Sequence, residues 1–350
     1  MISYRLATHE DNEQLIGLTA ATGMAGNIGL RIDRKPDFFK LLELRGDTRV
    51  FVALDDDTII GCLCVSLQQV YVGGKIYPLQ YIGDLKVLEA YRNKGIGLQL
   101  CNEMADHVIA FGSDLAFLNV SKGNNKPVSF FRNRPKVPDF DNIGLFNIYQ
   151  FFGKKRETVH PGFTIESNRV SDELLEFLDR HYSKYELGTV INEEKLKGME
   201  HFTIRSSRKI IAAMCLMDTM HLKQNVVTNL SWKMKWLLRL LNVYNGIAGN
   251  SRMPLLNEPV RMIYIRWLAV DDQDPALVRL LINHARNIAY ERNYSFASIG
   301  LHEKDPLGKC FRGMFKLTFH SVGMLLSIKN SRELIEKVKQ GVPFEDYSLV

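Results

Sequence analysis

The sequence lacks the features that mark membrane-spanning and secreted chains. None of its 350 residues falls in a run of the roughly 18 uninterrupted apolar residues that a transmembrane helix requires. The first residues, Met1 to Arg5, contain no basic run followed by an apolar block, so they do not resemble a signal peptide. We therefore expect no membrane span and a cytoplasmic location.

Cysteine is scarce, and its spacing matches neither disulfide frameworks nor zinc sites. The five cysteines are an odd number and contain no C-x-x-C pair. No group of histidines and cysteines has the spacing of zinc ligands. We expect buried free thiols in a reducing compartment and no metal. The residues concerned are Cys62, Cys64, Cys101, Cys215 and Cys310.

A strong charge of one sign is also missing. The net charge of +6 is small for 350 residues, whereas nucleic-acid binding favours a concentrated basic face, so we expect no nucleic-acid partner. The hydrophobic content of 46% and the charged content of 24% are those of a globular protein, and the length suggests two domains.

The first half alternates between helical and strand patterns. We expect helices after Thr8 as N-cap, from Pro36, at Gly97–Phe111 and at Lys126–Arg132. Strands are expected at Ile2–Ala7, Arg49–Leu54, Thr58–Val70, Ile76–Leu88, Leu115–Val120 and Asn142–Phe152, the last one closing the unit.

The same order of elements begins again after the polar segment 153–157. Strands are expected at Gly162–Ser167, His201–Ser206, Lys209–Met217, Met262–Val270 and Ser295–Gly300, with helices at Asp172–Tyr185 and Ala276–Tyr290. We interpret this as a tandem duplication with domains at 1–153 and 154–350. The predicted class is α/β (a mixed α+β sheet), with each domain a mostly antiparallel twisted sheet flanked by helices.

One segment, Leu85 to Gly97, has the chemistry of an anion site. A strand ends, the chain turns through a basic loop that contains Gly95, and a helix begins near Gly97. Free amides at a helix start and the helix dipole attract anions, and glycine leaves room for a phosphate to approach. The spacing lacks the third glycine of a Rossmann fingerprint, and no Gly-Lys pair is followed by Ser or Thr as in a P-loop. It does fit R-x-x-G-x-G, as Arg92, Gly95 and Gly97.

In this strand–loop–helix context the first 150 residues or so resemble the GNAT superfamily of acyl-coenzyme A-dependent N-acyltransferases. The resemblance implies acetyl-coenzyme A or another acyl-coenzyme A as co-substrate, with its pantetheine added beside the strand backbone at Val87. An amide near Leu88 would polarise the thioester carbonyl. The implied coenzyme A residues are Val87, Leu88, Arg92, Asn93, Lys94, Gly95, Ile96, Gly97, Leu98 and Asn125.

Acyl transfer to an amine requires a base, because only the unprotonated amine attacks. Asp84 lies in the strand that leads to the loop and is the first candidate, with Glu89 as a weaker one; a solvent-facing Asp84 beside Gly83 is the alternative. Family members often carry a tyrosine as acid where this chain has Phe131 or Arg132. Tyr149 is our candidate substitute, with Tyr91 as a second, although such tyrosines are more often core or rim aromatics.

The second half lacks the glycine loop. At the matching junction, Asp271, Asp272 and Asp274 precede Pro275, and three carboxylates would repel a pyrophosphate. We therefore expect a degenerate second domain that does not bind coenzyme A in the same way. An inserted basic and aromatic segment at 232–239 suits either a helix covering the groove between the halves or one lying on a membrane or acidic partner.

These patterns predict an N-acyltransferase, with acetyl as the expected acyl group, that uses direct attack by a primary amine of a small molecule or peptide. A non-catalytic acyl-coenzyme A sensor is the alternative, because no hydroxyl stands at the usual acid position. A third possibility keeps the fold but transfers to an aminoacyl or peptide acceptor. The sequence leaves the acceptor, the acyl length and the oligomeric state open.

Overall fold

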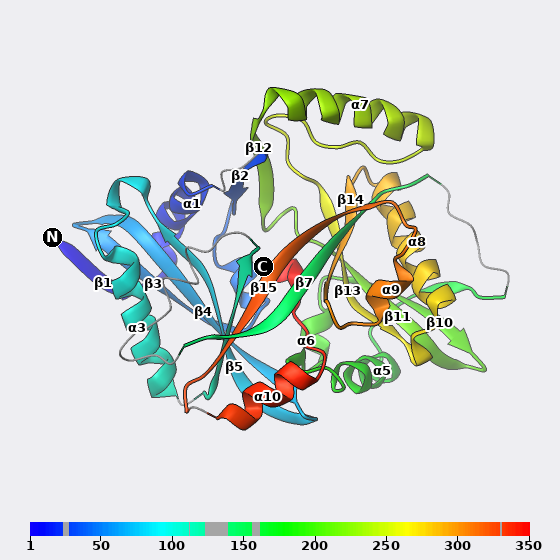
Figure 1. Ribbon diagram of the computed structural model, residues 1–350, viewed down its shortest axis with the longest axis horizontal. Helices are drawn as coiled ribbons and strands as arrows, with labels where there is room; N and C mark the ends of the chain where they lie inside the picture. The colour runs from blue at the N-terminus through cyan, green and yellow to red at the C-terminus, as the bar shows by residue number, and fades with distance from the viewer. Residues whose placement is uncertain (24–27, 112, 123–138, 156–161, 330) are drawn as a thin grey trace.

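The computed structural model describes residues 1–23, 28–111, 113–122, 139–155, 162–329 and 331–350. One large mixed sheet runs through the described chain, and helices cover both of its faces (Figure 1). The predicted class is confirmed. The predicted helix at Lys126–Arg132 and the predicted coenzyme A residue Asn125 lie outside the described residues.

The first half supplies strands β1, β3, β4, β5, β6 and β7 of this sheet. Their bounds are Ile2–Leu6, Asp47–Asp55, Thr58–Val72, Lys75–Val87, Leu115–Ser121 and Asp141–Phe152. Helices α1 (Asn12–Ala21) and α2 (Lys40–Glu43) cover one face, and α3 (Ile96–Phe111) covers the other. Alternate residues of β3 and β4 face these two helical layers, as expected for a sheet that is buried on both sides.

The second half repeats the arrangement with β8, β10, β11, β13, β14 and β15. Their bounds are Ile165–Asn168, Glu200–Ser206, Lys209–Asp218, Met262–Val270, Phe296–His302 and Lys316–Ser327. Helix α5 (Asp172–Tyr182), capped by Ser171, packs on one face, and α8 (Pro275–Glu291) packs on the other. Shorter elements are β9 (Gly188–Thr189), α6 (Glu193–Leu196), α9 (Leu307–Cys310) and α10 (Arg332–Gln340).

The strand order is β1-β3-β4-β5-β6-β15-β7-β14-β13-β11-β10-β8, with β9 paired to β4. Apart from β9, the strand order is symmetric. The strands counted inward from the β1 edge correspond one by one to those counted inward from the β8 edge. Among the strands that the structure describes, only the pair β5–β6 and its counterpart β13–β14 are parallel. The predicted repeat of element order is therefore present in three dimensions, while the boundary at residue 153 stays a prediction.

Two expectations about individual elements were wrong, and one strand was not expected. The strand β7 does not close the first unit, because it pairs with β14 and β15, and β15 in turn pairs with β6. No helix begins at Pro36; the turn α2 begins only at Lys40. A strand that was not expected, β2 (Ile28–Asp33), pairs with β12 (Gln224–Leu230) of the second half. For the two strands, a partner distant in sequence decides the structure.

The cysteines are all free and buried, as predicted. Cys62 and Cys64 face the α1–α2 layer from β4, where they pack with leucine and valine side chains. Burial raises the pKa of the Cys62 thiol to about 12, so it behaves as an apolar packing residue.

Candidate active site

The loop between β5 and α3 has the open backbone that the sequence predicts. Gly95 is exposed with φ +81°, and a Cβ placed on it would meet no atom within 4 Å. The first hydrogen bond of α3 runs from the Gln99 N–H to the Gly95 carbonyl, at 3.0 Å. The first N–H groups of a helix have no partner inside it. The amides of residues 96–98 therefore have no partner inside the helix and can bind an anion beside the open position of Gly95.

Side-chain contacts hold this loop in place. The Tyr91 hydroxyl donates to Asp55 Oδ2 at 2.8 Å, and the Arg92 Nε donates to the Val87 carbonyl at 3.3 Å. The Lys94 ammonium lies 5.0 Å from the centre of the Tyr91 ring. Arg92 and Lys94 are exposed, so the loop presents two cations beside its free amides.

Beyond the loop, strands β5 and β6 separate. They pair only where Leu79–Tyr81 meets Leu115–Phe117. From Ile82 onward β5 pairs with β4 alone, and the end of β6 pairs with β15. The unpaired edge of β5 can therefore accept an extended ligand as an added strand, as the resemblance implies for pantetheine beside Val87. We call the gap between β5 and β6 at this edge the slot.

The amide predicted near Leu88 to polarise the thioester carbonyl is not that of Leu88 itself. The Leu88 N–H donates to the Ile60 carbonyl at 2.9 Å, so this amide is already in use. Val87, the last residue of β5, pairs with Gly61 and its carbonyl accepts from Arg92. A backbone N–H that stabilises an oxyanion here would therefore have to belong to a residue next to Leu88.

Asp84 occupies a bulge in β5. The register changes from Cys62↔Lys86 to Cys64↔Gly83, which leaves an extra residue on β5, and Asp84 has φ +52°. Bulges of this kind redirect side chains beside binding sites. The bulge turns Asp84 toward charged groups at the junction of the two halves.

The Asp84 carboxylate is held by two cations. Its Oδ2 lies 2.7 Å from Arg34 Nη2, and its Oδ1 lies 3.5 Å from Lys86 Nζ. The side chain of Arg34 is 3% exposed and that of Asp84 is 15% exposed. Burial raises the pKa of Asp84, but Arg34 and Lys86 outweigh burial and hold the pKa well below the usual carboxyl range. Asp84 is therefore neither solvent-facing nor, by itself, a strong base.

A lysine from the second half completes this group, which we call the Asp84 cluster: Arg34, Asp84, Lys86 and Lys223. Burial, followed by the positive charge of Arg34, lowers the pKa of Lys223 to about 7, while Asp84 acts in the opposite direction. The Lys223 ammonium donates to the carbonyl oxygen of Val350. Among the described residues, the Nε and Nη1 of Arg34 have no hydrogen-bond partner. Arg34 and Lys223 were not predicted as site residues, because neither stands in a motif and only the fold brings them to β5.

This combination of loop and slot belongs to a known family of domains. Residues 27–134 match the model of the acetyltransferase (GNAT) family. The chain is a GNAT-fold protein. No curated protein matches the sequence.

Solved structures resemble this GNAT-fold chain over nearly its whole length. N-myristoyltransferase from Saccharomyces cerevisiae with bound myristoyl-CoA has a TM-score of 0.62 and 11% identity, covering 93% of this chain and 82% of that one. A GCN5-related N-acetyltransferase from Anabaena variabilis has a TM-score of 0.53 and 11% identity, covering 94% and 73%. A probable N-acyltransferase of unknown function from Enterococcus faecalis has a TM-score of 0.52 and 12% identity, again covering 94% and 73%. At these identities the likeness concerns the fold.

The structure places the candidate acid Tyr149 in the core of the second half. Its ring packs edge-on against Phe311, with centroids 5.1 Å apart, and stacks with Phe151. Burial raises its pKa. The other candidate, Tyr91, donates to Asp55, and the position of Phe131 lies outside the described residues. The contacts of Tyr149 are thus those of a packing residue.

The corresponding place in the second half of the GNAT-fold chain is filled. Strands β13 and β14 also pair over only three residues and then separate. Trp267, at φ +51°, occupies the bulge that corresponds to Asp84, and it is buried. Segment Phe344–Ser348 lies in the gap: a Cβ on Gly300 would stand 2.7 Å from Tyr347, and the remaining cavity measures about 20 Å³.

The helix start of the second half also differs as the sequence predicts. The short 3-10 turn Asp271–Gln273 takes the place of the glycine loop, and Pro275 is the first residue of α8. The Asp274 Oδ1 accepts from the Ala276 N–H at 2.8 Å. A carboxylate thus occupies the helix start where, in the first half, the amides are free.

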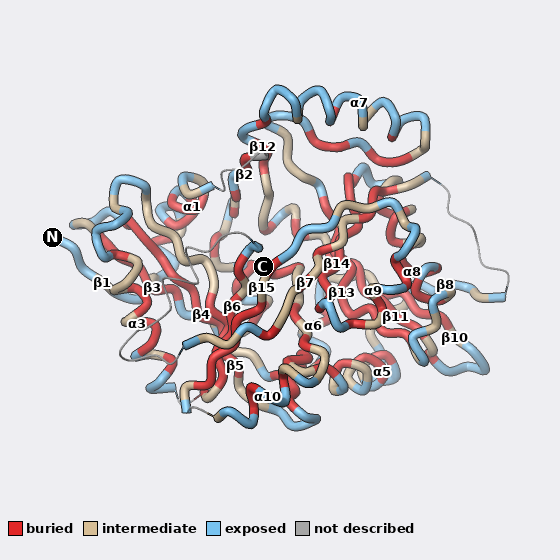
Figure 2. The backbone as a smooth tube through the Cα atoms, viewed as in Figure 1, coloured by how far each residue is buried: buried red, intermediate tan, exposed pale blue. Residues whose placement is uncertain are grey.

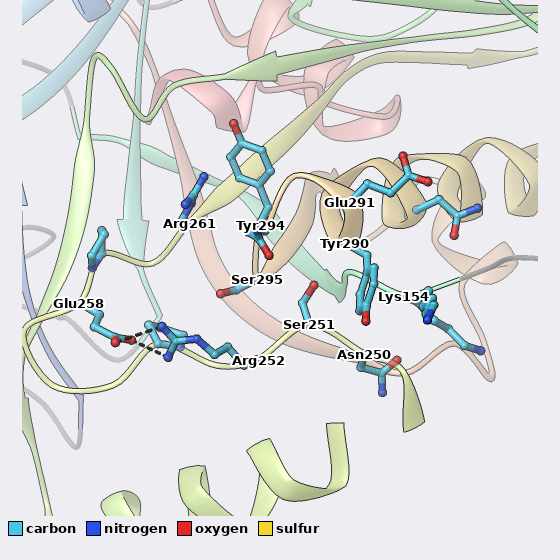
Figure 3. Close-up of a pocket in the computed structure, with 15 residues that line it drawn as sticks. Lys154, Asn250, Ser251, Arg252, Glu258, Arg261, Tyr290, Glu291, Tyr294 and Ser295 are labelled. Carbon is cyan, nitrogen blue, oxygen red and sulfur yellow. Dashed lines mark hydrogen bonds and ion pairs between the residues drawn. The ribbon is translucent and has the colours of Figure 1, made fainter. Parts of the chain in front are cut away.

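A larger cavity, of about 1240 Å³, lies in the second half, and no residue of the 88–97 loop lines it (Figure 3). Its wall contains cations and anions together, including the Arg252–Glu258 ion pair at 2.8 Å. Lys154 enters it from the segment that joins the halves. No sequence pattern predicts this cavity, because it is formed by the end of α8 together with loops far apart in the chain.

Proposed function

We propose that this protein is an acyl-coenzyme A-dependent N-acyltransferase with one active site, in the first half. The exposed glycine loop in front of α3, directly beside the gap between β5 and β6, carries this proposal. The loop amides and the cations Arg92 and Lys94 hold the pyrophosphate, and the gap receives the pantetheine and the acyl group. The second half serves to complete the acceptor side, because its own gap holds residues 344–348.

The acceptor is a primary amine of a small molecule or peptide that attacks the thioester carbonyl carbon. A C–N bond forms, the C–S bond breaks, and coenzyme A leaves as a thiolate with a pKa of about 8.5, for which an acid is useful but not essential. The amine must also lose a proton. Lys223, with a pKa near 7, accepts this proton, and the charges of Arg34 and Asp84 shift its pKa in opposite directions.

Binding without turnover is the second candidate function. The tight ion pair between Asp84 and Arg34 favours it, because a carboxylate with a lowered pKa does not readily deprotonate an amine. A sensor of this kind would bind acyl-coenzyme A in the same loop and slot. The two candidates therefore share a site and differ only in chemistry.

Thiol release distinguishes the two. The full chain is mixed with acetyl-, octanoyl- or myristoyl-coenzyme A and a panel of amino acids, polyamines and short peptides, and free thiol is measured with a disulfide dye. Amine-dependent release that is lost in Gly95→Glu and kept in Gly74→Glu supports the enzyme. Gly74 is a matched control because it also has positive φ and open space, in the turn at the other end of β5. Saturable binding of acyl-coenzyme A with no release from any amine favours the sensor, and no binding refutes both.

A further inference from the structure

The helix α7 (Trp232–Ala248) has one face packed on the protein and one face that no described residue covers. Its inner residues Met234, Leu238 and Leu241 join a cluster with Phe152 and Leu30, so the helix covers elements of both halves. Asn242 exchanges two hydrogen bonds with the main chain of Met253, at 2.6 and 3.2 Å. The orientation of α7 about its own axis is therefore fixed.

The outer face is apolar throughout its length. At 100° per residue, five large residues form one stripe directly opposite the buried side: Trp232, Trp236, Leu240, Val243 and Ile247. Trp232 is 69% exposed and Ile247 is 84% exposed. Scattered apolar residues on a surface are ordinary, but a contiguous stripe marks a site of interaction. Figure 2 shows α7 at the upper edge of the molecule, with most of its length coloured as exposed.

The charges around the stripe are all of one sign. Between residues 232 and 248 the sequence contains Lys233, Lys235 and Arg239 and no Asp or Glu. The Lys233 ammonium lies 5.7 Å from the Trp232 ring, and the Arg239 guanidinium lies 5.4 Å from the Trp236 ring. Cations thus flank the indole rings, as in helices that lie at a membrane surface.

We propose that α7 docks this protein on an anionic lipid bilayer, with the helix lying in the plane of the headgroups. The stripe enters the acyl boundary, the indole rings lie at the headgroup level, and the three cations bind lipid phosphates. A second copy of the chain fits less well, because pairing two such helices brings six cations together without an anion. No helix among the described residues is both long and apolar enough to cross a bilayer, so the attachment is peripheral. The inference is independent of the proposed enzymatic function.

Vesicle co-sedimentation tests this proposal with the full chain. The vesicles contain phosphatidylcholine alone or phosphatidylcholine mixed with phosphatidylglycerol. We expect binding to the anionic vesicles only, weakening with salt, together with a blue shift of tryptophan fluorescence from Trp232 and Trp236. Replacing Lys233 by Gln should weaken binding about fivefold, because each basic residue near an anionic surface contributes about 1 kcal/mol. The double variant Trp236→Ala/Ile247→Asp should abolish it.

Matched variants separate docking from folding. Ile76 is also an exposed apolar residue, in the β4–β5 hairpin, so Ile76→Asp should bind vesicles like the unchanged protein. The outer-face variant should keep the thermal unfolding temperature, because its side chains are exposed. Equal binding of the Trp236→Ala/Ile247→Asp variant, or no preference for anionic lipid, would overturn the proposal. So would concentration-dependent dimerisation that this variant abolishes, since that identifies a second copy as the occupant.

Discussion

Gly95 offers the sharpest test of the coenzyme A site. Its exposed position, φ of +81° and open surroundings mean that a side chain fits in space and costs only the strain of the left-handed backbone, about 1–2 kcal/mol. Gly95→Glu adds a carboxylate where we place the pyrophosphate, whereas Gly95→Gln adds the same volume without the charge. The difference between these two variants therefore isolates the electrostatic contribution.

The size of this difference follows from the exposure of the loop. Two unit charges about 4 Å apart in water interact by about 1 kcal/mol. Repulsion from two phosphates thus totals about 2 kcal/mol, so Gly95→Glu should bind coenzyme A about 30-fold more weakly than Gly95→Gln. Raising the ionic strength should reduce the ratio, because salt screens exposed charges.

Isothermal titration with coenzyme A measures the effect, and 3′-dephospho-coenzyme A confirms that the pyrophosphate rather than the 3′-phosphate is involved. Gly74→Glu, in a similar backbone conformation on the β4–β5 turn, should leave the affinity unchanged. If Gly95→Glu and Gly95→Gln bind coenzyme A within twofold of each other at low salt, the loop does not hold the pyrophosphate and the proposed function fails with it.

Three further predictions concern charges inside the fold. The pH profile of kcat/KM should rise with a midpoint near 7 as Lys223 loses its proton; Lys223→Met should remove this rise, and Asp84→Asn should move the midpoint to lower pH, because Asp84 raises the pKa of Lys223. Burial lowers the pKa of His181 to about 4, so the free energy of unfolding should fall by about 3 kcal/mol as the pH drops from 6.5 to 4 and should fall less in His181→Asn, as measured by urea titration. The Arg45–Glu345 ion pair, 2.8 Å long and buried, links the first half to the segment after α10; Arg45→Met should cost about 3–5 kcal/mol in the same assay, and a further Glu345→Leu should restore much of it, whereas a loss below 1 kcal/mol would contradict this role.

The sequence predicted those parts of the fold that depend on neighbouring residues. The helices predicted at Gly97–Phe111, Asp172–Tyr185 and Ala276–Tyr290 all have local causes, and each lies within a few residues of where the pattern placed it. The glycine loop is similar, because a positive φ at Gly95 and a helix beginning at Ile96 are encoded within six residues.

What the sequence did not predict depends on contacts between distant segments. The strand β2 exists because β12, nearly 200 residues later, supplies its only described partner in the sheet order. Lys223 reaches the Asp84 cluster from the connection between β11 and β12, and no spacing in the chain relates the two. The partners of β7 were not predicted, because β15 lies between β6 and β7 in the sheet. A strand pattern indicates that a strand forms but not which neighbour it pairs with.

The position of β15 between β6 and β7 has a consequence for the folding of the chain. The exposed edge of β6 is covered only when residues 316–327 arrive, about two hundred positions after β6 has left the ribosome. Contacts so distant in sequence form slowly, and an unpaired edge is a site of aggregation until they do. A fragment that ends near residue 153 would therefore keep the loop and the slot and yet expose β6 and β7, so a minimal acyltransferase cannot be cut from this chain by dividing it in the middle.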